Sequence, residues 1–363
     1  MSQTAIPFVF MRGGSSRGPY FNAADLPKDR GTLANVLVSL LGSGHQLNID
    51  GIGGGNAVTT KVAMLSKSDD PWADVDYFFA QVSVLDGLVD FKPSCGNILA
   101  GVASAAIEMG LVAPTGDETV VNIRAVNTES KTKAVVQTPG GQISYDGMAQ
   151  IDGVPGSAAP VALNFLEVAG SLTNKFLPTG NLIDVIDGID VTCMDVAMPM
   201  VIARAADFGL TATETVAELD ENKAFFARME AIRLKASELM GMGDCTKSVT
   251  PKFGLLSPSD KPNTIRTRYF MPWNTHPTMA VTGSQCLASC ALAKGTIADG
   301  MMVVQGKPPI TIQLEHPMGS MDVIVDYTEA QGGFQHQSTG IIRTCRKLAD
   351  GHVFVPKDVW DGQ

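Results

Sequence analysis

Charged side chains are scarce in this chain of 363 residues, where Asp, Glu, Lys and Arg together make up only 18%. Disordered and coiled-coil proteins carry far more charge, so the composition argues against both classes. The net charge of −10 argues against nucleic acid and anionic membranes as partners. A few local cations or helix N-termini would still allow an anionic small molecule to bind.

Long apolar runs and targeting signals are also lacking. No window of the sequence reaches the length of an apolar transmembrane helix. The N-terminal segment has an apolar patch but neither the basic region nor the small-residue cleavage site of a signal peptide. We therefore expect a cytoplasmic protein that does not associate with membranes.

Metal-binding and cofactor-binding patterns are missing as well. The five histidines and six cysteines show no metal-ligand spacing, and the cysteines form no disulfide framework. The sequence has no GxSxG or HExxH motif, no Walker loop and no dinucleotide-binding fingerprint. We expect no metal and no cofactor, and a reducing compartment.

Apolar residues, glycine and proline are plentiful, with 45% hydrophobic residues, 37 glycines and 20 prolines. This composition suits a compact protein with a sizeable core, many strands and tight turns. Strand-like stretches outnumber helical ones, which favours an α+β fold over an alternating parallel βαβ array. The chain length favours two domains.

Two predicted helices consist almost wholly of small and apolar residues. One runs over 96–109 and the other over 283–294, and each is followed by a glycine. A helix that is apolar on all sides must be surrounded by protein, so each half is expected to wrap strands around a central helix. We predict two pseudo-symmetric lobes, 1–184 and 185–363. Two helix N-termini that faced one cleft would together form an anion site.

Cys95 stands at the predicted start of the first of these helices, in the run Ser94–Ala100. There its thiol would face unpaired backbone amides and the positive end of the helix dipole, which lower a thiol pKa. Gly96 and Asn97 leave room for a ligand to approach those amides. Free cysteines are more commonly small buried hydrophobes, but the position favours a reactive thiol.

Two glycine-rich segments precede this cysteine. The first, over 13–18, offers backbone amides with Ser15, Ser16 and Arg17, which suit a carboxylate or phosphate, although it also reads as a plain turn. The second, over 50–56, contains Gly54 and Asn56 and is followed by Lys61 at the start of an apolar strand. Desolvation there would lower the lysine pKa and make it a candidate base, whereas the alternative is a surface lysine.

In the second half, His276 precedes the entry to the other apolar helix at Thr282, Gly283 and Ser284. The imidazole could bind a substrate carboxylate or act as an acid. A histidine in a loop is more commonly solvated or capping. Aligning the two helix entries places Thr282 and Gly283 opposite Cys95 and Gly96.

These motifs together resemble the PrpF-type isomerase family. The segment over 11–18 resembles the family's N-terminal MRGGTSKG motif, and the remaining signatures follow in the family's order, at 49–54, 94–97, 276–283 and 343–348. The resemblance spans essentially the whole chain, and within the family the chain is similar to the 4-oxalomesaconate tautomerases of gallate and protocatechuate breakdown. It implies a diaminopimelate-epimerase-like fold and a cofactor-independent proton shift on an unsaturated tricarboxylate.

The resemblance also implies which residues react. The family's active-site lysine and cysteine correspond to Lys61 and Cys95. Ser15 and Arg17 replace the usual Thr and Lys of the first motif, and Thr282 stands where a two-thiol epimerase would carry its second cysteine. The predicted substrate-binding residues are Ser15, Ser16, Arg17, Gly54, Asn56, Gly96, Asn97, His276, Thr282, Gly283 and Ser284.

Three functions stay open at this point. The first is a 4-oxalomesaconate isomerase, and the second is an aconitate or 2-methylaconitate isomerase that uses the same residues. The third is a non-catalytic tricarboxylate-binding protein, against which the presence of both Lys61 and Cys95 argues. The sequence leaves homodimerisation open.

Overall fold

The computed structural model describes residues 2–92, 94–271, 273–330 and 333–362. The chain forms two compact units, which we call unit 1 (Met1–Asn164 with Ile342–Gln363) and unit 2 (Phe165–Ile341). No helix among the described residues is long and apolar enough to cross a membrane.

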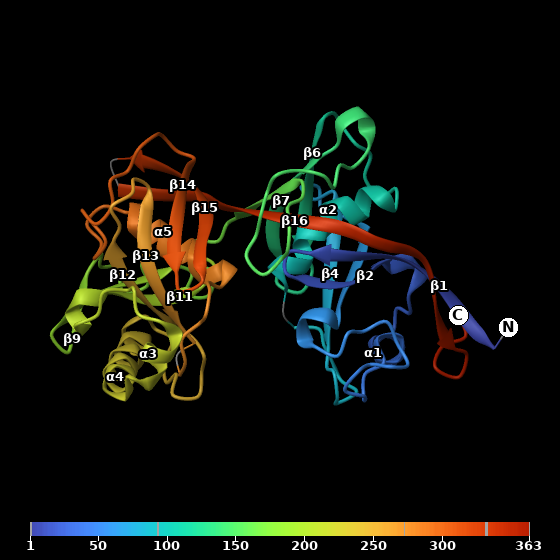
Figure 1. Cartoon of the computed structure of the whole chain (residues 1–363), viewed down its shortest axis with the longest axis horizontal. Helices are drawn as coiled ribbons and strands as arrows, with labels where there is room; N and C mark the ends of the chain where they lie inside the picture. The colour runs from blue at the N-terminus through green and yellow to red at the C-terminus, as the bar shows by residue number, and fades with distance from the viewer. Residues whose placement is uncertain (1, 93, 272, 331–332, 363) are drawn as a thin grey trace. The chain divides into compact units, whose positions relative to one another are not determined.

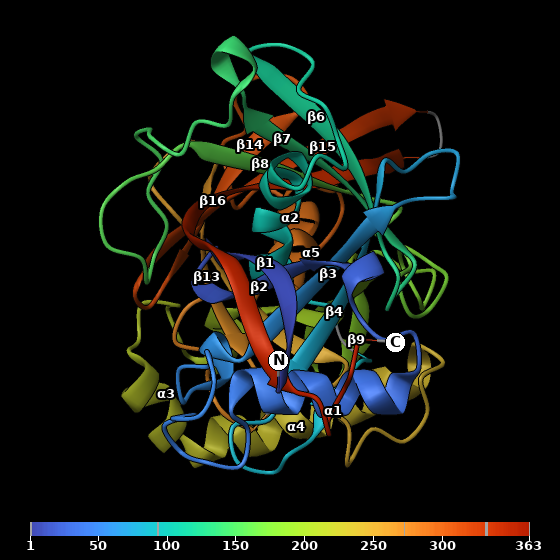
Figure 2. The same cartoon turned by 90° about the vertical axis from the view of Figure 1, so that its right-hand side faces the viewer.

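The strands of unit 1 curve around one apolar helix, α2 (Gly96–Glu108) (Figure 1). The strands that lie wholly in this unit are β1 (Gln3–Gly13), β2 (Ser16–Asn22), β3 (Lys61–Lys67), β4 (Val75–Val82), β5 (Val89–Asp90), β6 (Glu118–Ala125) and β7 (Ser130–Gln137). Figure 2 shows α2 among these strands, and it packs against β1, β2, β3, β4 and β7. From Ile98 to Ala106 every residue of α2 is buried, as expected for a helix that is apolar on all sides.

A second helix, α1 (Arg30–Leu41), covers the other face of this sheet. Asp29 caps its N-terminus and Gly42 ends it in the left-handed conformation. Leu33, Leu37 and Leu40 of α1 join the apolar core that β2, β3 and β4 form on that face. The short helices of the unit are η1 (Ala23–Asp25), η2 (Ala57–Thr59) and η3 (Pro139–Gly141).

Unit 2 is built in the same way around α5 (Val281–Leu292), which packs against its strands. The strands that lie wholly in this unit are β9 (Asp184–Ile186), β10 (Ile189–Asp195), β11 (Pro199–Arg204), β12 (Lys252–Pro258), β13 (Thr264–Phe270), β14 (Ile310–His316) and β15 (Gly319–Ala330). The other helices are η4 (Ala205–Phe208), α3 (Val216–Glu221) and α4 (Lys223–Leu239). Phe225, Met229 and Ile232 of α4 pack on the sheet face away from α5.

The order of strand pairings is the same in the two units. In unit 1 the pairs β1–β2, β3–β4 and β6–β7 are antiparallel, and β2–β3 and β4–β6 are parallel. In unit 2 the pairs β10–β11, β12–β13 and β14–β15 are antiparallel, and β11–β12 and β13–β14 are parallel. The prediction of an α+β fold, with strands wrapped around a central apolar helix in each lobe, is confirmed.

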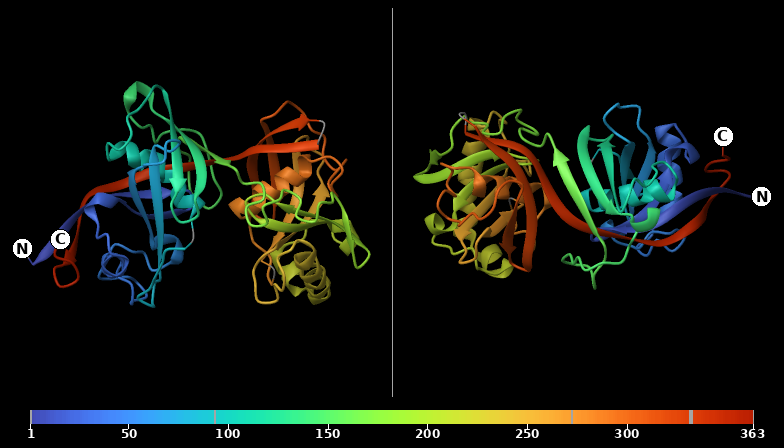
Figure 3. Two further views of the ribbon diagram at one scale, coloured as in Figure 1. Left: turned by 180° about the vertical axis from the view of Figure 1, so that it is seen from behind. Right: turned by 90° about the horizontal axis from the view of Figure 1, so that it is seen from above.

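The division of the chain differs from the expected lobes 1–184 and 185–363. Two strands, β8 (Pro160–Leu166) and β16 (Gly333–Pro356), run from one unit into the other. Figure 3 follows β16 along this path: its first part pairs with β15 and its last part with β1. No local sequence pattern shows that the residues from 333 to 356 form one strand with two different partners.

Candidate functional site

The first glycine-rich motif forms a hairpin rather than a loose loop. Gly13 pairs with Ser16 across the hairpin, so only Gly14 and Ser15 make the turn. Gly14 has a φ of 53°, which favours glycine. Ser16 and Arg17 therefore belong to β2. The structure shows the turn that was one of the two interpretations of this segment, and its role in anion binding stays a prediction.

Asn97 in the first turn of α2 holds this turn in place. Its side-chain oxygen accepts the Ser15 N–H at 3.4 Å, and its amide donates to Ser15 Oγ at 3.1 Å. A Cβ on Gly14 would lie 2.2 Å from Asn97 Oδ1, so no larger residue fits there. The Ser16 hydroxyl is buried and has no hydrogen-bond partner among the described residues.

Cys95 is the residue immediately before α2, as the sequence predicted. Its side chain is half-buried and makes no capping hydrogen bond, while its carbonyl accepts the Leu99 N–H at 2.9 Å. The first-turn amides of α2 have no partner within the helix, which is the usual condition for an anion site at a helix start.

Two buried tyrosines form hydrogen bonds with backbone carbonyls at the start of α2. Tyr77 donates to the carbonyl of Cys95 at 3.3 Å, and Tyr20 donates to the carbonyl of Ile98 at 2.6 Å. Burial raises the pKa of both hydroxyls well above the ordinary value of 10.0, so both remain protonated donors. The sequence analysis missed these two positioning residues, since nothing local connects them to the helix.

Lys61 is the first residue of β3 and is half-buried. Its ammonium donates to Gln81 Oε1 at 2.6 Å and lies 5.3 Å from the centre of the Phe79 ring. Val62 and Met64 point into the core under α1, so alternation along the strand places Lys61 on the opposite face, the one that α2 covers.

Gln81 is the most informative residue that sequence reasoning missed. It is the cross-strand partner of Lys61 in the antiparallel pair of β3 and β4. Its amide donates to the carbonyls of Ala57 at 3.1 Å and Thr60 at 3.2 Å, which leaves its oxygen for the lysine. A polar residue inside an apolar strand was the available signal, but only the strand register connects it to Lys61.

The second glycine-rich segment lies beside Arg17. A Cβ on Gly54 would lie 2.8 Å from Arg17 Nη2 and 2.7 Å from Thr59 Oγ1, so the guanidinium approaches this backbone closely. Asn56 is exposed, and its side chain accepts the Val58 N–H to cap η2. In the structure Asn56 thus has a capping role, and its predicted role in binding stays a prediction.

The second predicted group lies in unit 2, at the start of α5. His276 donates its backbone N–H to Tyr269 at 2.8 Å, and its Nδ1 accepts the Thr278 N–H at 3.0 Å. Burial lowers the His276 pKa, with a smaller contribution from the charge of Lys252. The neutral imidazole therefore keeps its proton on Nε2, which can still donate to a ligand.

The entry to α5 differs from the expected one. The helix begins at Val281, so Thr282 lies inside the first turn, whereas Cys95 lies outside α2. The Ser284 hydroxyl is buried and donates to the carbonyl of Val281 at 2.8 Å. A Cβ on Gly283 would lie 2.1 Å from the Tyr269 ring, so this glycine serves helix packing.

The structure therefore brings the predicted residues together in two groups, which we describe separately. The group in unit 1 gathers at the β1–β2 hairpin, the second glycine-rich segment, β3 and the start of α2, and consists of Ser15, Ser16, Arg17, Gly54, Asn56, Lys61, Cys95, Gly96 and Asn97. The group in unit 2 consists of His276, Thr282, Gly283 and Ser284. The assignment of these residues to substrate stays a prediction.

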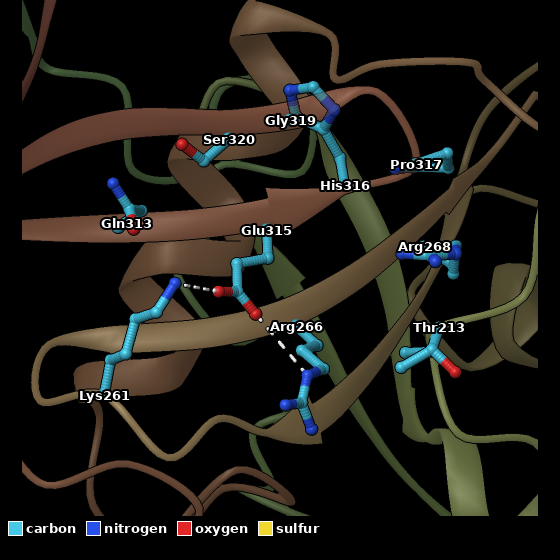
Figure 4. A pocket seen from close by; sticks show the side chains of 11 residues that line it. Thr213, Lys261, Arg266, Arg268, Gln313, Glu315, His316, Pro317, Gly319 and Ser320 are labelled. Atoms are coloured by element: carbon cyan, nitrogen blue, oxygen red, sulfur yellow. Dashed lines mark hydrogen bonds and ion pairs between the residues drawn. The ribbon is translucent and has the colours of Figure 1, made fainter.

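A cavity of about 440 Å³ lies elsewhere in unit 2, and none of the predicted site residues lines it. Figure 4 shows its charged wall, where Glu315 lies between Lys261 at 3.0 Å and Arg266 at 3.4 Å. Arg268 beside it donates to the carbonyls of Glu214 and Thr267. Because these charges already have partners, we assign no ligand to this cavity.

Comparison with known proteins gives consistent matches along the whole chain. A family model described as PrpF protein matches residues 3–356. The (4E)-oxalomesaconate Delta-isomerase of Novosphingobium sp. (strain KA1) is 44% identical over 349 residues, covering 96% of this chain and 97% of that protein. The 4-oxalomesaconate tautomerase of Pseudomonas putida is 40% identical over 364 residues, covering 100% of this chain and 99% of that protein. The crystal structure of a methylitaconate-delta-isomerase superimposes with a TM-score of 0.91 and 34% identity, covering 99% of this chain and 97% of that one.

Proposed function

This chain belongs to the PrpF family and is an isomerase, and from this premise we propose that it moves a carbon–carbon double bond by an allylic 1,3-proton shift. We propose an unsaturated tricarboxylate as its substrate, with 4-oxalomesaconate favoured. Two relatives named for oxalomesaconate, at 44% and 40% identity, support this choice.

One structural observation carries the proposal. Lys61 and Cys95 both come from the face of unit 1 that contains α2: the lysine from a strand that α2 covers and the cysteine from the position immediately before the helix. Gln81 and Phe79 hold the lysine, so its nitrogen keeps a defined position rather than exploring solvent. A positioned amine beside unpaired helix amides is suited to removing a proton and stabilising the charge that results.

The reaction needs no net change other than the position of one proton and one double bond. Lys61, in its neutral form, removes a proton from a carbon next to a carboxylate or keto group. The electron pair spreads into a dienolate, whose negative charge the first-turn amides of α2 stabilise. A proton then returns two carbons away, from Lys61 itself or from Cys95.

In unit 1, the groups that we propose to bind the substrate are ones that suit carboxylates. The Arg17 guanidinium can bind a carboxylate in a bidentate manner, and the Ser16 hydroxyl is available as a donor. Asn97 is already engaged with Ser15, so its contribution is to place the hairpin against α2 rather than to bind the ligand alone.

The experiment that tests the proposal is proton NMR of the enzyme in D₂O with 4-oxalomesaconate and then with cis-aconitate. Double-bond migration and deuterium incorporation with 4-oxalomesaconate alone are the expected result. Turnover of cis-aconitate alone would move the assignment to an aconitate or methylaconitate isomerase. Binding of both without any exchange would favour the non-catalytic tricarboxylate-binding protein.

The relative of known structure, at 34% identity, is named methylitaconate-delta-isomerase. This makes 3-methylitaconate the appropriate third compound in the same assay. Cytoplasmic localisation and homodimerisation stay predictions from the sequence.

A further inference from the structure

Unit 2 contains a buried lysine whose charge has no partner. Lys252 is the first residue of β12, and only 5% of its surface is exposed. Its ammonium makes no hydrogen bond or ion pair with any of the residues that the structure describes. A buried ammonium without a partner is costly, so proteins rarely retain one unless a ligand or a function needs it.

Lys252 occupies the position in unit 2 that Lys61 occupies in unit 1. Each is the first residue of a strand that runs parallel to one neighbour, β2 or β11, and antiparallel to the other, β4 or β13. The cross-strand partner of Lys61 is Gln81, which accepts its hydrogen bond. In unit 2, Phe253 pairs with Phe270, so the continued register places Met271 opposite Lys252. A thioether cannot replace the amide oxygen as an effective acceptor.

The charged groups nearest to Lys252 are cationic. Burial lowers its pKa, and the charge of Arg233 lowers it further. Arg233 itself is paired with Glu230 and donates to the carbonyls of Pro251 and Cys245. No carboxylate among the described residues raises the Lys252 pKa.

Alternation along β12 places Lys252 on the α5 side of the sheet. Phe253 and Leu255 point into the core with α4, whereas a Cβ on Gly254 would lie 2.7 Å from Leu287 of α5. Tyr269, the partner of Gly254, packs against Gly283 in the first turn of α5. Lys252 lies two residues before Gly254, toward the end of the sheet where α5 begins.

The same end of unit 2 carries His276, whose backbone bonds to Tyr269. The charge of Lys252 contributes to the lowered pKa of His276, which is consistent with their closeness. Unpaired amides of the first turn of α5 complete the group. The lysine ammonium, an imidazole N–H and helix amides are donors at this end of unit 2, and no hydrogen bond joins the ammonium to an acceptor among the described residues.

The geometry points to Lys252 as a binding site for one carboxylate of the substrate, with His276 and the first turn of α5 beside it. This inference rests on the proposed function only for the identity of the ligand as a small polycarboxylate. A carboxylate would supply the acceptor that Lys252 lacks and form a charge-assisted hydrogen bond with it.

The test uses tricarballylate, a saturated tricarboxylate that cannot isomerise, and measures its affinity for the full-length protein by isothermal titration calorimetry. We expect Lys252→Met to weaken binding about tenfold or more, because a hydrogen bond to a charged group is lost. Lys252→Gln serves as a second variant in case the first does not fold. Lys235→Met, which removes an exposed lysine of the same unit, is the matched control and should bind as wild type does.

Two further readouts separate a binding role from other roles. Tm of the unliganded Lys252→Met protein should equal or exceed that of wild type, because an unpartnered buried charge is removed. In the isomerase assay KM should rise while kcat falls less than tenfold. Unchanged affinity and KM in both variants would overturn the inference, as would a loss of kcat at unchanged KM.

Failure of the inference can be distinguished from failure of the proposed function. A wild-type protein that isomerises its substrate but does not need Lys252 for affinity contradicts only the inference. A wild-type protein that catalyses no exchange contradicts the proposed function. Tricarballylate binding that depends on Lys252 would support the inference in either case.

Discussion

Unit 1 and unit 2 have the same order of strand pairings around a central apolar helix, yet they hold their lysines differently. In unit 1, Lys61 is half-buried and bonded to Gln81. In unit 2, Lys252 is buried, and continuation of the register past the pair Phe253–Phe270 would place Met271 opposite it. The comparison shows that one scaffold surrounds its two lysines with different cross-strand neighbours, which is why we propose different roles for them.

The two central helices, α2 and α5, also differ in the residues at their starts. Cys95 lies just before α2, with its thiol free of capping contacts. The residue just before α5 is Ala280, and the hydroxyl of Ser284 is used within the helix. The side chains that we propose as reactive are therefore in unit 1, while the start of α5 offers backbone amides and an imidazole.

The largest expected effect is that of removing the amine of unit 1. Lys61→Met should lower kcat by about 10³-fold, the scale of a lost general base, without changing the fold. The NMR assay in D₂O measures the rate, and circular dichroism checks the fold. Lys67→Met on the same strand, which removes an exposed lysine, is the control and should keep wild-type activity. A near-normal kcat in Lys61→Met would remove this lysine from the mechanism.

The next comparison concerns the glycines that allow a tyrosine to pack on each central helix. A Cβ on Gly101 would lie 2.4 Å from the Tyr20 hydroxyl, and one on Gly283 would lie 2.1 Å from the Tyr269 ring. Alanine at either position should destabilise the protein by about 2 kcal/mol, because overpacking exceeds the gain in helix propensity. Urea denaturation measures the effect.

Gly31→Ala in α1 provides the control for this pair. It lies in an exposed helical position where a Cβ would meet only Asp29 Oδ2 at 3.3 Å. There the alanine should be neutral or stabilise the protein by up to about 1 kcal/mol. Equal effects at all three positions would contradict the packing argument.

Acid should destabilise the protein through His336 of unit 2. Burial lowers the His336 pKa from 6.5 to about 4, and its Nε2 has no hydrogen-bond partner among the described residues. The unfolded state then binds more protons than the folded state, so stability that is complete above about pH 6.5 is lost as pH falls toward 4. Between pH 7.5 and pH 5 the loss should be about 2 kcal/mol.

Denaturation at the two pH values tests this assignment. His336→Gln should reduce the pH dependence, whereas His352→Gln at an exposed position of unit 1 should leave it unchanged. If His336→Gln retains the full pH dependence, the effect belongs to other groups.

The smallest expected effect comes from introducing a glutamine near Lys252, as Gln81 stands opposite Lys61 in unit 1. Met271→Gln should place an amide oxygen near Lys252 and compete with the ligand carboxylate for its ammonium. We expect tricarballylate affinity to fall severalfold, with little change in stability, as measured by calorimetry. Tighter binding of tricarballylate by Met271→Gln would contradict the equivalence of the Lys61 and Lys252 positions that the strand register suggests.

Much of the fold could be predicted from local patterns. The two apolar helices followed from their runs of small and apolar residues, each followed by a glycine. The α5 boundaries were wrong by two residues at each end, because the apolar run gives no capping signal there. The segment over 13–18 was left open between a turn and a ligand-binding loop, because glycines and serines are typical of both, and the structure shows a hairpin turn.

The site was predicted where motifs are contiguous and missed where they are not. Cys95 and Lys61 were singled out from their neighbours in the sequence. Gln81, Tyr20 and Tyr77 were missed, because each acts on a residue from 18 to 78 positions away. Lys252 gave no local signal at all.

The sequence by itself determined that this is an α+β protein with two similar halves and that a lysine and a cysteine of the first half are the reactive candidates. Apolar periodicity and helix-start chemistry are local properties, so they can be read along the chain. Only the tertiary structure decided that Lys61 has Gln81 as its acceptor and that Lys252 has none among the described residues, because a cross-strand partner is set by register between segments far apart in sequence. For the same reason only the structure showed that the long strand β16 belongs to both units.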